Sequence, residues 1–423
     1  MILDRSITPG FQIPKEISFP KPSIRTLSNG VPIYFIPTPE IDAIKLEINS
    51  DADSLYKNSD KKLVPSFALQ MVMEGTKTKN AAELDDFFDT YATEVEPIMG
   101  FEHQGLSLLT TKKHFETVLP VFRELLTEAV FPEKELVKRK KQKALSISIH
   151  KEQNGHRASS LFRKVLFGEE HPFGQIAEES DVDLFEREDL AEYYQNELWT
   201  NPEIFLTGNI GENELNAIAQ VFGNLPVRLT NKTPDGGFKN KYQVLREEKE
   251  KSVQSSIRIG CHMIPKTHPD YHSLLIFNTI LGGYFGCRLI KNIREDKGYT
   301  YGINSSLGGL KTSDYWIVMA DVIKEFSDKV IEEIYHEIET LQQIPVPVDE
   351  METVRNYMVG KLLTQFSSSF DLIGRFKSIH QAGLDFSFFQ EHLEHILNFN
   401  QEDIMAVGRK YFKRENMVEV IVG

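Results

Sequence analysis

The chain contains short segments that alternate between apolar and polar residues, and longer segments in which apolar residues recur about every 3.6 positions. The first pattern predicts a half-buried strand and the second an amphipathic helix. Strands are predicted at 31–37, 43–49, 254–264 and 315–321, and long helices at 112–130 and 349–366. Strands come early in each half and long helices follow, without a regular strand–helix alternation. This order favours an α+β class, a mostly antiparallel sheet with helices packed on one face.

The same landmarks recur after about half the chain. Four pairs show it: Val118 and Val330 (330 − 118 = 212), Pro132 and Pro347 (347 − 132 = 215), Glu188 and Glu402 (402 − 188 = 214), and 204–208 and 419–423 (419 − 204 = 215). A nearly constant offset over separate landmarks indicates a duplicated unit rather than the short repeats of a solenoid. We therefore predict two homologous α/β-sandwich domains.

The boundary between the domains is predicted from composition. Residues 229–243 are rich in Gly, Pro, Asn and Lys, which is typical of a linker. We predict an N-terminal domain at 1–228, an exposed linker at 229–245 that tolerates change, and a C-terminal domain at 246–423.

Composition narrows the class of protein. The 423 residues carry a formal net charge of −14, which argues against a nucleic-acid binder because such proteins present a basic face. Cys261 and Cys287 are too few for a disulfide framework, so buried, reduced thiols are expected. No segment approaches the ~20 apolar residues of a membrane span, so no membrane association is expected. We expect a cytoplasmic protein, unless an export signal has been removed.

Two clusters could carry chemistry on residue type alone, and each has a structural alternative. His392 and His395, with neighbouring glutamates, could grip a metal, but their charged positions fall opposite apolar ones on one helix, which favours a solvated face. The glycine run in 281-LGGYFGCRL-289 follows a helix-like segment and lacks a phosphate-loop ending. By itself it indicates a turn that needs positive φ.

The segment 293-IREDKGYTYGINSSL-307 is more informative. Arg294 lies on the last turns of a predicted helix, Gly298 is placed as its C′ residue, and Tyr299 and Tyr301 share one face of the strand that follows. A strand that returns past the helix end can bring Arg294 and Tyr301 into one cleft. The structural alternative is an Arg that complements the helix dipole and a Tyr that fills core.

These blocks together resemble the pitrilysin/insulinase family of zinc peptidases, in particular the two-domain branch that includes the mitochondrial processing peptidase. The resemblance spans essentially the whole chain. The matching motifs are 29-NGVPIYFIP-37, 75-GTKTKNAAEL-84, 171-HPFG-174 and 281-LGGYFGCRLIKNIREDKGYTYG-302. The last block, with its order of glycines, Arg, Gly and Tyr, is the most specific.

The resemblance implies a zinc site that this chain has lost. Active members carry H-x-x-E-H on the first long helix, with two His as zinc ligands and the Glu as general base. The motif falls here on 66-SFALQ-70, so Ser66, Leu69 and Gln70 stand at the functional positions. The family's third ligand should fall near 144–149, where no carboxylate occurs, and Glu152 is displaced. We therefore expect no metal in this chain and no hydrolysis by it alone.

The resemblance also implies that the second half of the active site is retained. Related enzymes use an Arg and a Tyr seven residues apart to bind the peptide carbonyl and its developing oxyanion, and Arg294 and Tyr301 have that separation (301 − 294 = 7). Gly282, Gly283 and Gly286 resemble the substrate-handling loop of the non-catalytic processing-peptidase subunit, although Tyr284 and Phe285 make this loop bulkier.

Two functions from different classes follow from the resemblance. The first is the non-catalytic subunit of a heterodimeric metallopeptidase, which would assist a homologous zinc-bearing partner in cleaving extended peptides. A homodimer of the isolated chain stays open. The alternative is a structural or peptide-binding scaffold subunit, in which Arg294 and Tyr301 are packing residues.

Overall fold

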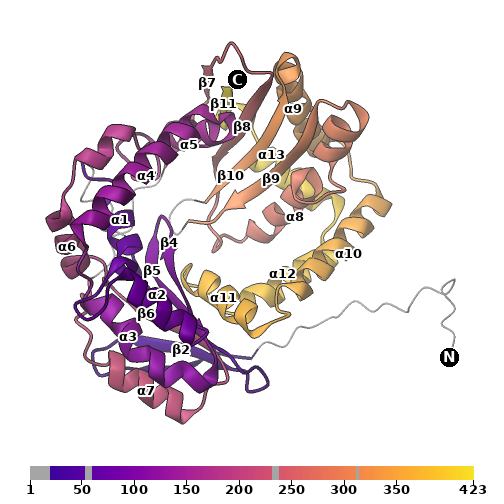
Figure 1. Cartoon of the computed structure of the whole chain (residues 1–423). Helices are drawn as coiled ribbons and strands as arrows, with labels where there is room; N and C mark the ends of the chain where they lie inside the picture. The colour runs from indigo at the N-terminus through magenta and orange to yellow at the C-terminus, as the bar shows by residue number, and fades with distance from the viewer. Residues whose placement is uncertain (1–19, 53–59, 231–237, 311–313) are drawn as a thin grey trace, which may run out of the picture.

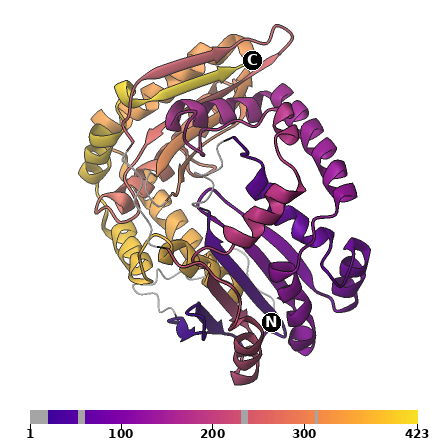
Figure 2. The same ribbon diagram turned by 90° about the vertical axis from the view of Figure 1, so that its left-hand side faces the viewer.

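The structure, a computed structural model, describes residues 20–52, 60–230, 238–310 and 314–423 and consists of two similar halves (Figure 1). Each half is a sheet with helices packed on it. Figure 2 views the molecule from the side, with the second sheet and the C-terminus at the top and the first sheet below. The predicted α+β class with two sandwich domains is confirmed.

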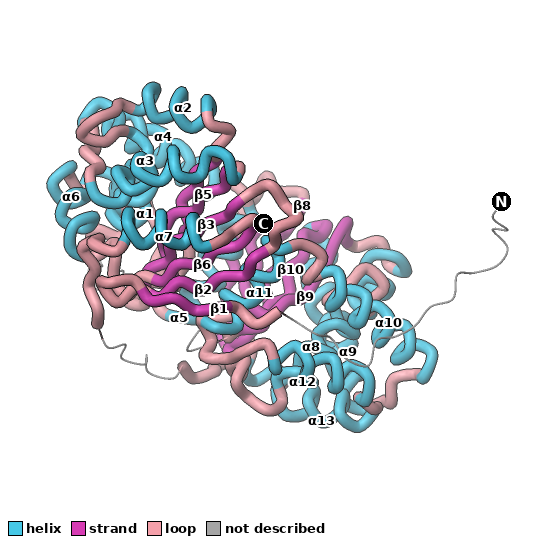
Figure 3. The backbone as a smooth tube through the Cα atoms, turned by 90° about the horizontal axis from the view of Figure 1, so that it is seen from below, coloured by secondary structure: helices cyan, strands magenta, loops and turns pink. Residues whose placement is uncertain are grey.

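The described strands of the first half form a six-stranded sheet in the order β1-β2-β6-β3-β5-β4. Figure 3 labels β1, β2, β6, β3 and β5 side by side in this sheet. Its strands are β1 (Ser23–Thr26), β2 (Pro32–Pro37), β3 (Ile44–Asp51), β4 (Glu94–Met99), β5 (His103–Thr110) and β6 (Glu203–Gly208). All neighbours run antiparallel except β2 and β6, which are parallel. β4 lies at one edge of the sheet, and Pro97 within it suits an edge because proline cannot donate to a ladder.

The described strands of the second half form a five-stranded sheet in the order β7-β11-β8-β10-β9. They are β7 (Gln243–Glu247), β8 (Gln254–His262), β9 (Thr300–Gly308), β10 (Tyr315–Ile323) and β11 (Val418–Val422). β7 and β11 are the parallel pair, as β2 and β6 are in the first half. The order therefore repeats that of β2-β6-β3-β5-β4. β7 begins at Gln243, so the last three residues of the predicted linker pair with β11.

The helices also repeat. Those of the first half are α1 (Val64–Met71), α2 (Ala81–Thr90), α3 (Phe115–Thr127), α4 (Glu133–Glu152), α5 (Asn154–Phe167), α6 (Arg187–Asn196) and α7 (Glu212–Phe222). Those of the second half are α8 (Tyr271–Gly282), α9 (Ser327–Gln343), α10 (Val348–Thr364), α11 (Ser369–His380), α12 (Ser387–Asn398) and α13 (Gln401–Tyr411), with a π-helix, η5 (Ile290–Asp296). Short 3-10 helices lie at Val72–Glu74, Lys112–His114, Glu179–Asp183, Lys324–Phe326 and Arg414–Asn416.

The predicted apolar stripes form the cores of the two halves. Val118 on α3 and its counterpart Val330 on α9 are both 0% exposed. Cys261 and Cys287 are buried, unpaired thiols, as predicted, and burial raises the pKa of Cys261 to about 12. Among the described residues, no helix combines the length and apolar composition needed to cross a bilayer.

Each half gives one helix to the other half's sheet. α5 packs on β8 and β11 of the second sheet (Figures 1 and 2). There Ala158 and Phe162 are buried against Ile317 and Val420. α11 packs on β2 and β6 of the first sheet in the same way. The two helices start 215 residues apart (369 − 154), which is the offset of the repeat. Since a buried large apolar side chain contributes about 1.5–3 kcal/mol, the exchange ties the two halves together.

Candidate functional site

The segment 66–70, which the resemblance aligns with the zinc motif, lies on α1. Pro65 occupies its first turn, where a missing N–H costs nothing, and Leu69 is 1% exposed in the core. Ser66 and Gln70 lie on the half-buried face. The Ser66 hydroxyl donates to the carbonyl of Leu63 at 2.9 Å, and the Gln70 amide approaches Met99 Sδ on β4 at 3.5 Å. α1 therefore presents a hydroxyl and an amide where the resemblance implies ligands.

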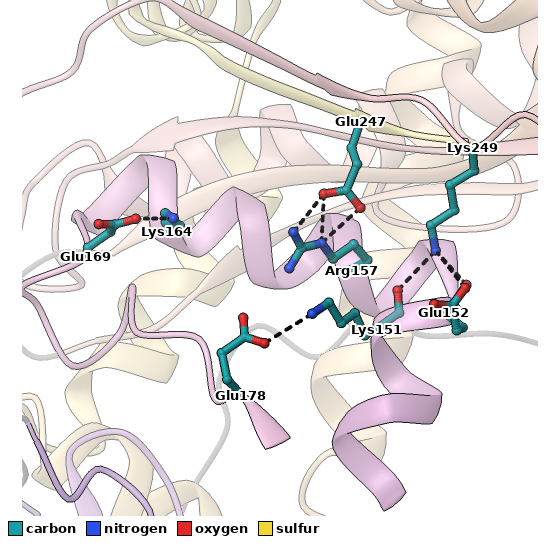
Figure 4. A network of polar contacts seen from close by, with 8 residues as sticks. All are labelled: Lys151, Glu152, Arg157, Lys164, Glu169, Glu178, Glu247 and Lys249. Atoms are coloured by element: carbon teal, nitrogen blue, oxygen red, sulfur yellow. Dashed lines mark hydrogen bonds and ion pairs between the residues drawn. The ribbon is translucent and has the colours of Figure 1, made fainter. Parts of the chain in front are cut away.

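The position expected for a third ligand lies on α4. Ile147 is buried there, and Glu152 is the last residue of the helix. Lys249 Nζ donates to the backbone carbonyl of Glu152 at 2.8 Å and lies 3.9 Å from its carboxylate (Figure 4). Among the described residues, no group of three or more His, Cys, Asp or Glu side chains is arranged to hold a metal ion. The donor set at Ser66, Leu69 and Gln70 does not fit zinc, which needs about three ligands drawn from His, Cys, Asp or Glu.

Arg294 and Tyr301 lie on either side of one tight turn. Arg294 is on η5, Gly298 has φ +66° in the turn, and β9 begins at Thr300. The N–H of Tyr299 donates to the carbonyl of Ile293 at 3.0 Å, which holds the start of β9 against the end of η5. Gly298 thus serves as the predicted C′ residue.

A β-bulge sets the direction of Tyr301. β10 pairs Asp321 with Gly302 and Val322 with Thr300, so Tyr301 is the extra residue of β9. The Thr300 hydroxyl donates to the carbonyl of Asp321 at 2.6 Å and accepts from the N–H of Gly302, which fixes the bulge. A bulge re-aims the side chain that it carries. Tyr301 is 87% exposed.

The prediction that Tyr299 and Tyr301 share one face of a strand is wrong. Tyr299 stacks on Phe326, with ring centroids 4.4 Å apart, and packs against the core. The bulge breaks the alternation between the two tyrosines, and this separates them. Arg294 is half-buried, and its guanidinium lies over the Phe285 ring at 5.0 Å.

The glycine run ends α8. The prediction that it needs positive φ is wrong for Gly282, Gly283 and Gly286, none of which has a left-handed conformation. Close approach explains Gly282 instead, because a Cβ there would lie 2.4 Å from Ser305 Oγ on β9. Phe285 is 66% exposed, whereas the Tyr284 ring packs on Tyr357 at 4.7 Å. The structure therefore places an exposed aromatic tip beside Arg294, and the substrate-handling role stays a prediction.

The histidine pair on α12 is only half solvated. His395 is exposed, as predicted, but His392 lies against His272 of α8, with the two Nδ1 atoms 3.2 Å apart. Burial, with the neighbouring histidines, lowers the pKa of His392 to about 3 and that of His272 to about 4. The contact of His392 with His272 could not be predicted from the sequence, because residues 120 positions apart carry no local signal of contact.

These features define a class of protein: a two-domain α+β fold in which the helix aligned by resemblance with a zinc motif carries no metal ligands. Known proteins with similar sequences are described as zinc proteases or as a probable inactive metalloprotease. Residues 185–358 match the family model described as the peptidase M16 inactive domain. The chain is 22% identical over 349 residues to YmxG of Bacillus subtilis (strain 168), an uncharacterized zinc protease, covering 81% of this chain and 84% of that one.

Two further relatives extend the comparison. The probable inactive metalloprotease YmfF of the same bacterium is 22% identical over 245 residues, which are 57% of this chain and 56% of that one. The crystal structure of a peptidase M16 inactive domain from Pseudomonas fluorescens superposes with a TM-score of 0.83 at 20% identity, covering 95% of this chain and 98% of that chain. Residues 185–358 are thus similar to the M16 inactive domain, and the chain as a whole is similar to proteins described as zinc proteases.

Proposed function

We propose that this chain is the catalytically incomplete subunit of a heterodimeric zinc peptidase of the processing-peptidase type. In this assembly a homologous partner subunit holds the zinc ion, which supplies the activated water. This chain contributes Arg294 and Tyr301, and the pair encloses extended peptides. A second copy of this chain adds no zinc ligands, so a homodimer is predicted to be inactive.

The exposure of Tyr301 is the observation that carries the proposal. A tyrosine that only fills core is buried, yet this ring is 87% exposed and is directed outward by a bulge. Arg294 lies before the turn at Gly298 and Tyr301 lies after it. The guanidinium of Arg294 is always charged. A guanidinium and a phenol that reach toward a partner can both donate to the carbonyl oxygen of a peptide bound there. Such donors are worth most where negative charge develops on that oxygen.

The edge strand β4 supports peptide binding by this subunit. It lies at the end of the first sheet, next to α1, and Met99 at its end is 50% exposed. Apart from Pro97, which has no N–H, the edge strand offers backbone N–H and C=O groups to which an extended peptide can add as a further strand. We propose that β4 aligns the substrate past the face of α1 that carries Ser66 and Gln70.

The proposal is tested by metal analysis and a peptidase assay. The isolated chain should hold no stoichiometric zinc and cleave no unfolded peptide. Activity should appear when it is mixed with a homologous chain that carries an intact H-x-x-E-H motif, obtained by co-purification from the native source. Stoichiometric zinc in the isolated chain, or cleavage by it, would refute the proposal. If no such partner confers cleavage, the scaffold function replaces it.

A further inference from the structure

The second half contains a cavity that the proposed active site does not use. It has a volume of about 220 Å³ and lies among α8, α10, α11 and α12. Its walls are largely apolar and include Tyr271, Leu275, Leu362, Phe388 and Phe389. We call it the cation-rimmed pocket, because the side chains of Lys266, Lys361 and Arg375 also line it.

The charge of this pocket is unusual for an acidic chain. None of its described lining residues is Asp or Glu, although the protein has 62 acidic and 48 basic residues. Lys266 donates to Ser378 Oγ at 3.3 Å, and Lys361 lies 5.7 Å from the centre of the Tyr357 ring. In the described structure, neither Lys361 nor Arg375 forms an ion pair with a carboxylate. An apolar cavity with uncompensated cations at its rim suits an apolar ligand that carries one negative charge.

The duplication supplies a comparison within the same molecule. A cavity of about 230 Å³ lies at the equivalent place in the first half, between α4 and α5. At the offset of 215 residues, Lys143 there corresponds to Met358, and Ser160 corresponds to Arg375.

Two of the four Lys and Arg side chains that line the first-half cavity form ion pairs with carboxylates. Arg157 pairs with Glu247 at 2.7 Å and Lys151 with Glu178 at 3.2 Å. The second-half pocket differs in that its described lining residues include no Asp or Glu, and neither Lys361 nor Arg375 has a carboxylate partner.

The size of the pocket limits its occupant. At roughly 30 Å³ per water, 220 Å³ equals about seven water molecules, below the ~300 Å³ at which drug-sized sites begin. One large apolar side chain with an attached carboxylate is of this size. A large apolar residue inside a peptide brings no carboxylate, whereas the same residue at the C-terminus brings its α-carboxylate.

We propose that the cation-rimmed pocket binds the C-terminal residue of a peptide. Its apolar side chain enters the cavity, and its α-carboxylate is held by Lys361 and Arg375. This inference rests on the peptide-binding function proposed above, and it adds a preference for substrates that end in a large apolar residue.

Calorimetric titration of the isolated full chain tests the inference without a partner subunit. The probes are acetyl-Ala-Ala-Ala-Phe with a free carboxylate and the same peptide as its C-terminal amide. The acid should bind, and the amide should bind about tenfold more weakly, because a charge-assisted contact is lost. Arg375→Gln should weaken binding of the acid about tenfold. Lys143→Gln, the control at the equivalent cavity, should leave the affinity unchanged.

A filling variant tests the cavity itself. Leu275→Trp should abolish binding of the acid, and its thermal unfolding curve shows whether the fold is kept; if it is not, the Arg375→Gln titration decides. Equal affinity for acid and amide, unchanged affinity in Arg375→Gln, or no binding of either peptide would overturn the inference. These outcomes leave the proposed function standing if partner mixtures still cleave. If the acid binds but no mixture cleaves peptide, the pocket assignment stands and the proposed peptidase function fails.

Discussion

Arg157 on α5 donates from Nε and Nη2 to both carboxylate oxygens of Glu247 on β7, at 2.7 to 3.0 Å (Figure 4). This fork joins a helix of the first half to the edge strand of the second half. A bidentate pair between planar groups is more specific in geometry than a lysine contact. The exchanged helix is therefore fixed by polar contacts as well as by its apolar face.

Glu247→Gln should destabilise the protein by about 1 kcal/mol at pH 7, because the pair is partly screened by solvent. The hydrogen bond from Arg157 holds the pKa of Glu247 below its ordinary value. The contribution is thus fully present above the unfolded pKa, about 4.3, and is lost as pH falls through the lower folded pKa.

Urea unfolding at pH 7 and pH 3 measures this effect. The difference between Glu247→Gln and the wild type should shrink at pH 3. Glu178→Gln is the matched control, since both partners of its ion pair are about half exposed. Its change should stay below about 0.5 kcal/mol. Equal effects of the two substitutions would contradict a special role for the fork.

Gly282→Ala should cost about 1–3 kcal/mol, because the new methyl would lie 2.4 Å from Ser305 Oγ and 2.8 Å from its backbone nitrogen. Gly374→Ala on α11 is the opposite case, since a Cβ there meets nothing within 4 Å. Alanine favours a helix over glycine by about 1 kcal/mol, so this variant should gain stability. Thermal unfolding of the pair tests the close approach, and a neutral Gly282→Ala would disprove it.

Stability should fall as pH drops from neutral towards 5. Burial, with the charge of His395, lowers the pKa of His272 to about 4, below the ordinary 6.5 of an unfolded histidine. The unfolded chain therefore binds the proton first, and the stabilisation is complete only above pH 6.5. At pH 5 the loss should be roughly 2 kcal/mol for His272 alone.

His272→Asn should flatten that pH dependence between pH 7.5 and 5, as measured by urea unfolding. His336→Asn, a change at an exposed histidine, should leave the dependence as it is in the wild type. An unchanged slope in His272→Asn would show that the contact between His272 and His392 does not set it.

Tyr301 should be dispensable for folding. Tyr301→Ala removes a ring that is 87% exposed, so the free energy of unfolding should change by less than about 0.5 kcal/mol. Tyr299→Ala removes the stacked neighbour and should cost about 2 kcal/mol. A large cost at Tyr301 would instead favour the packing function that the scaffold hypothesis assigns to it.

Much of the fold was predictable from periodicity. The strand-like segments 204–208 and 419–423 are β6 and β11, which occupy equivalent places in the two sheets, and the apolar stripes at Val118 and Val330 are core. These predictions are correct because a buried face of a strand or helix imposes its own period of apolar residues on the sequence. The exchange of α5 and α11 was not predictable, since an amphipathic helix has the same pattern whichever sheet it covers.

The residue types of the candidate site were predictable from the sequence, but the directions of its side chains were not. The donor chemistry of Ser66, Leu69 and Gln70 follows from the sequence alone. The orientation of Tyr301 depends on the β-bulge in β9. The simple alternation of strand side chains therefore wrongly predicted that Tyr299 and Tyr301 share one face. The contact between His272 and His392 depends on how α8 meets α12, and neither helix records it in its own sequence.

The turnover number of the mixture with a zinc-bearing partner tests the central claim most directly. Tyr301→Phe removes one hydroxyl from an exposed side chain and should lower kcat about 100-fold or more, the usual effect of losing one oxyanion donor. Tyr242→Phe, at another exposed tyrosine, should keep the wild-type kcat. If Tyr301→Phe and Tyr242→Phe mixtures turn over peptide as fast as the wild type, this chain does not complete the active site.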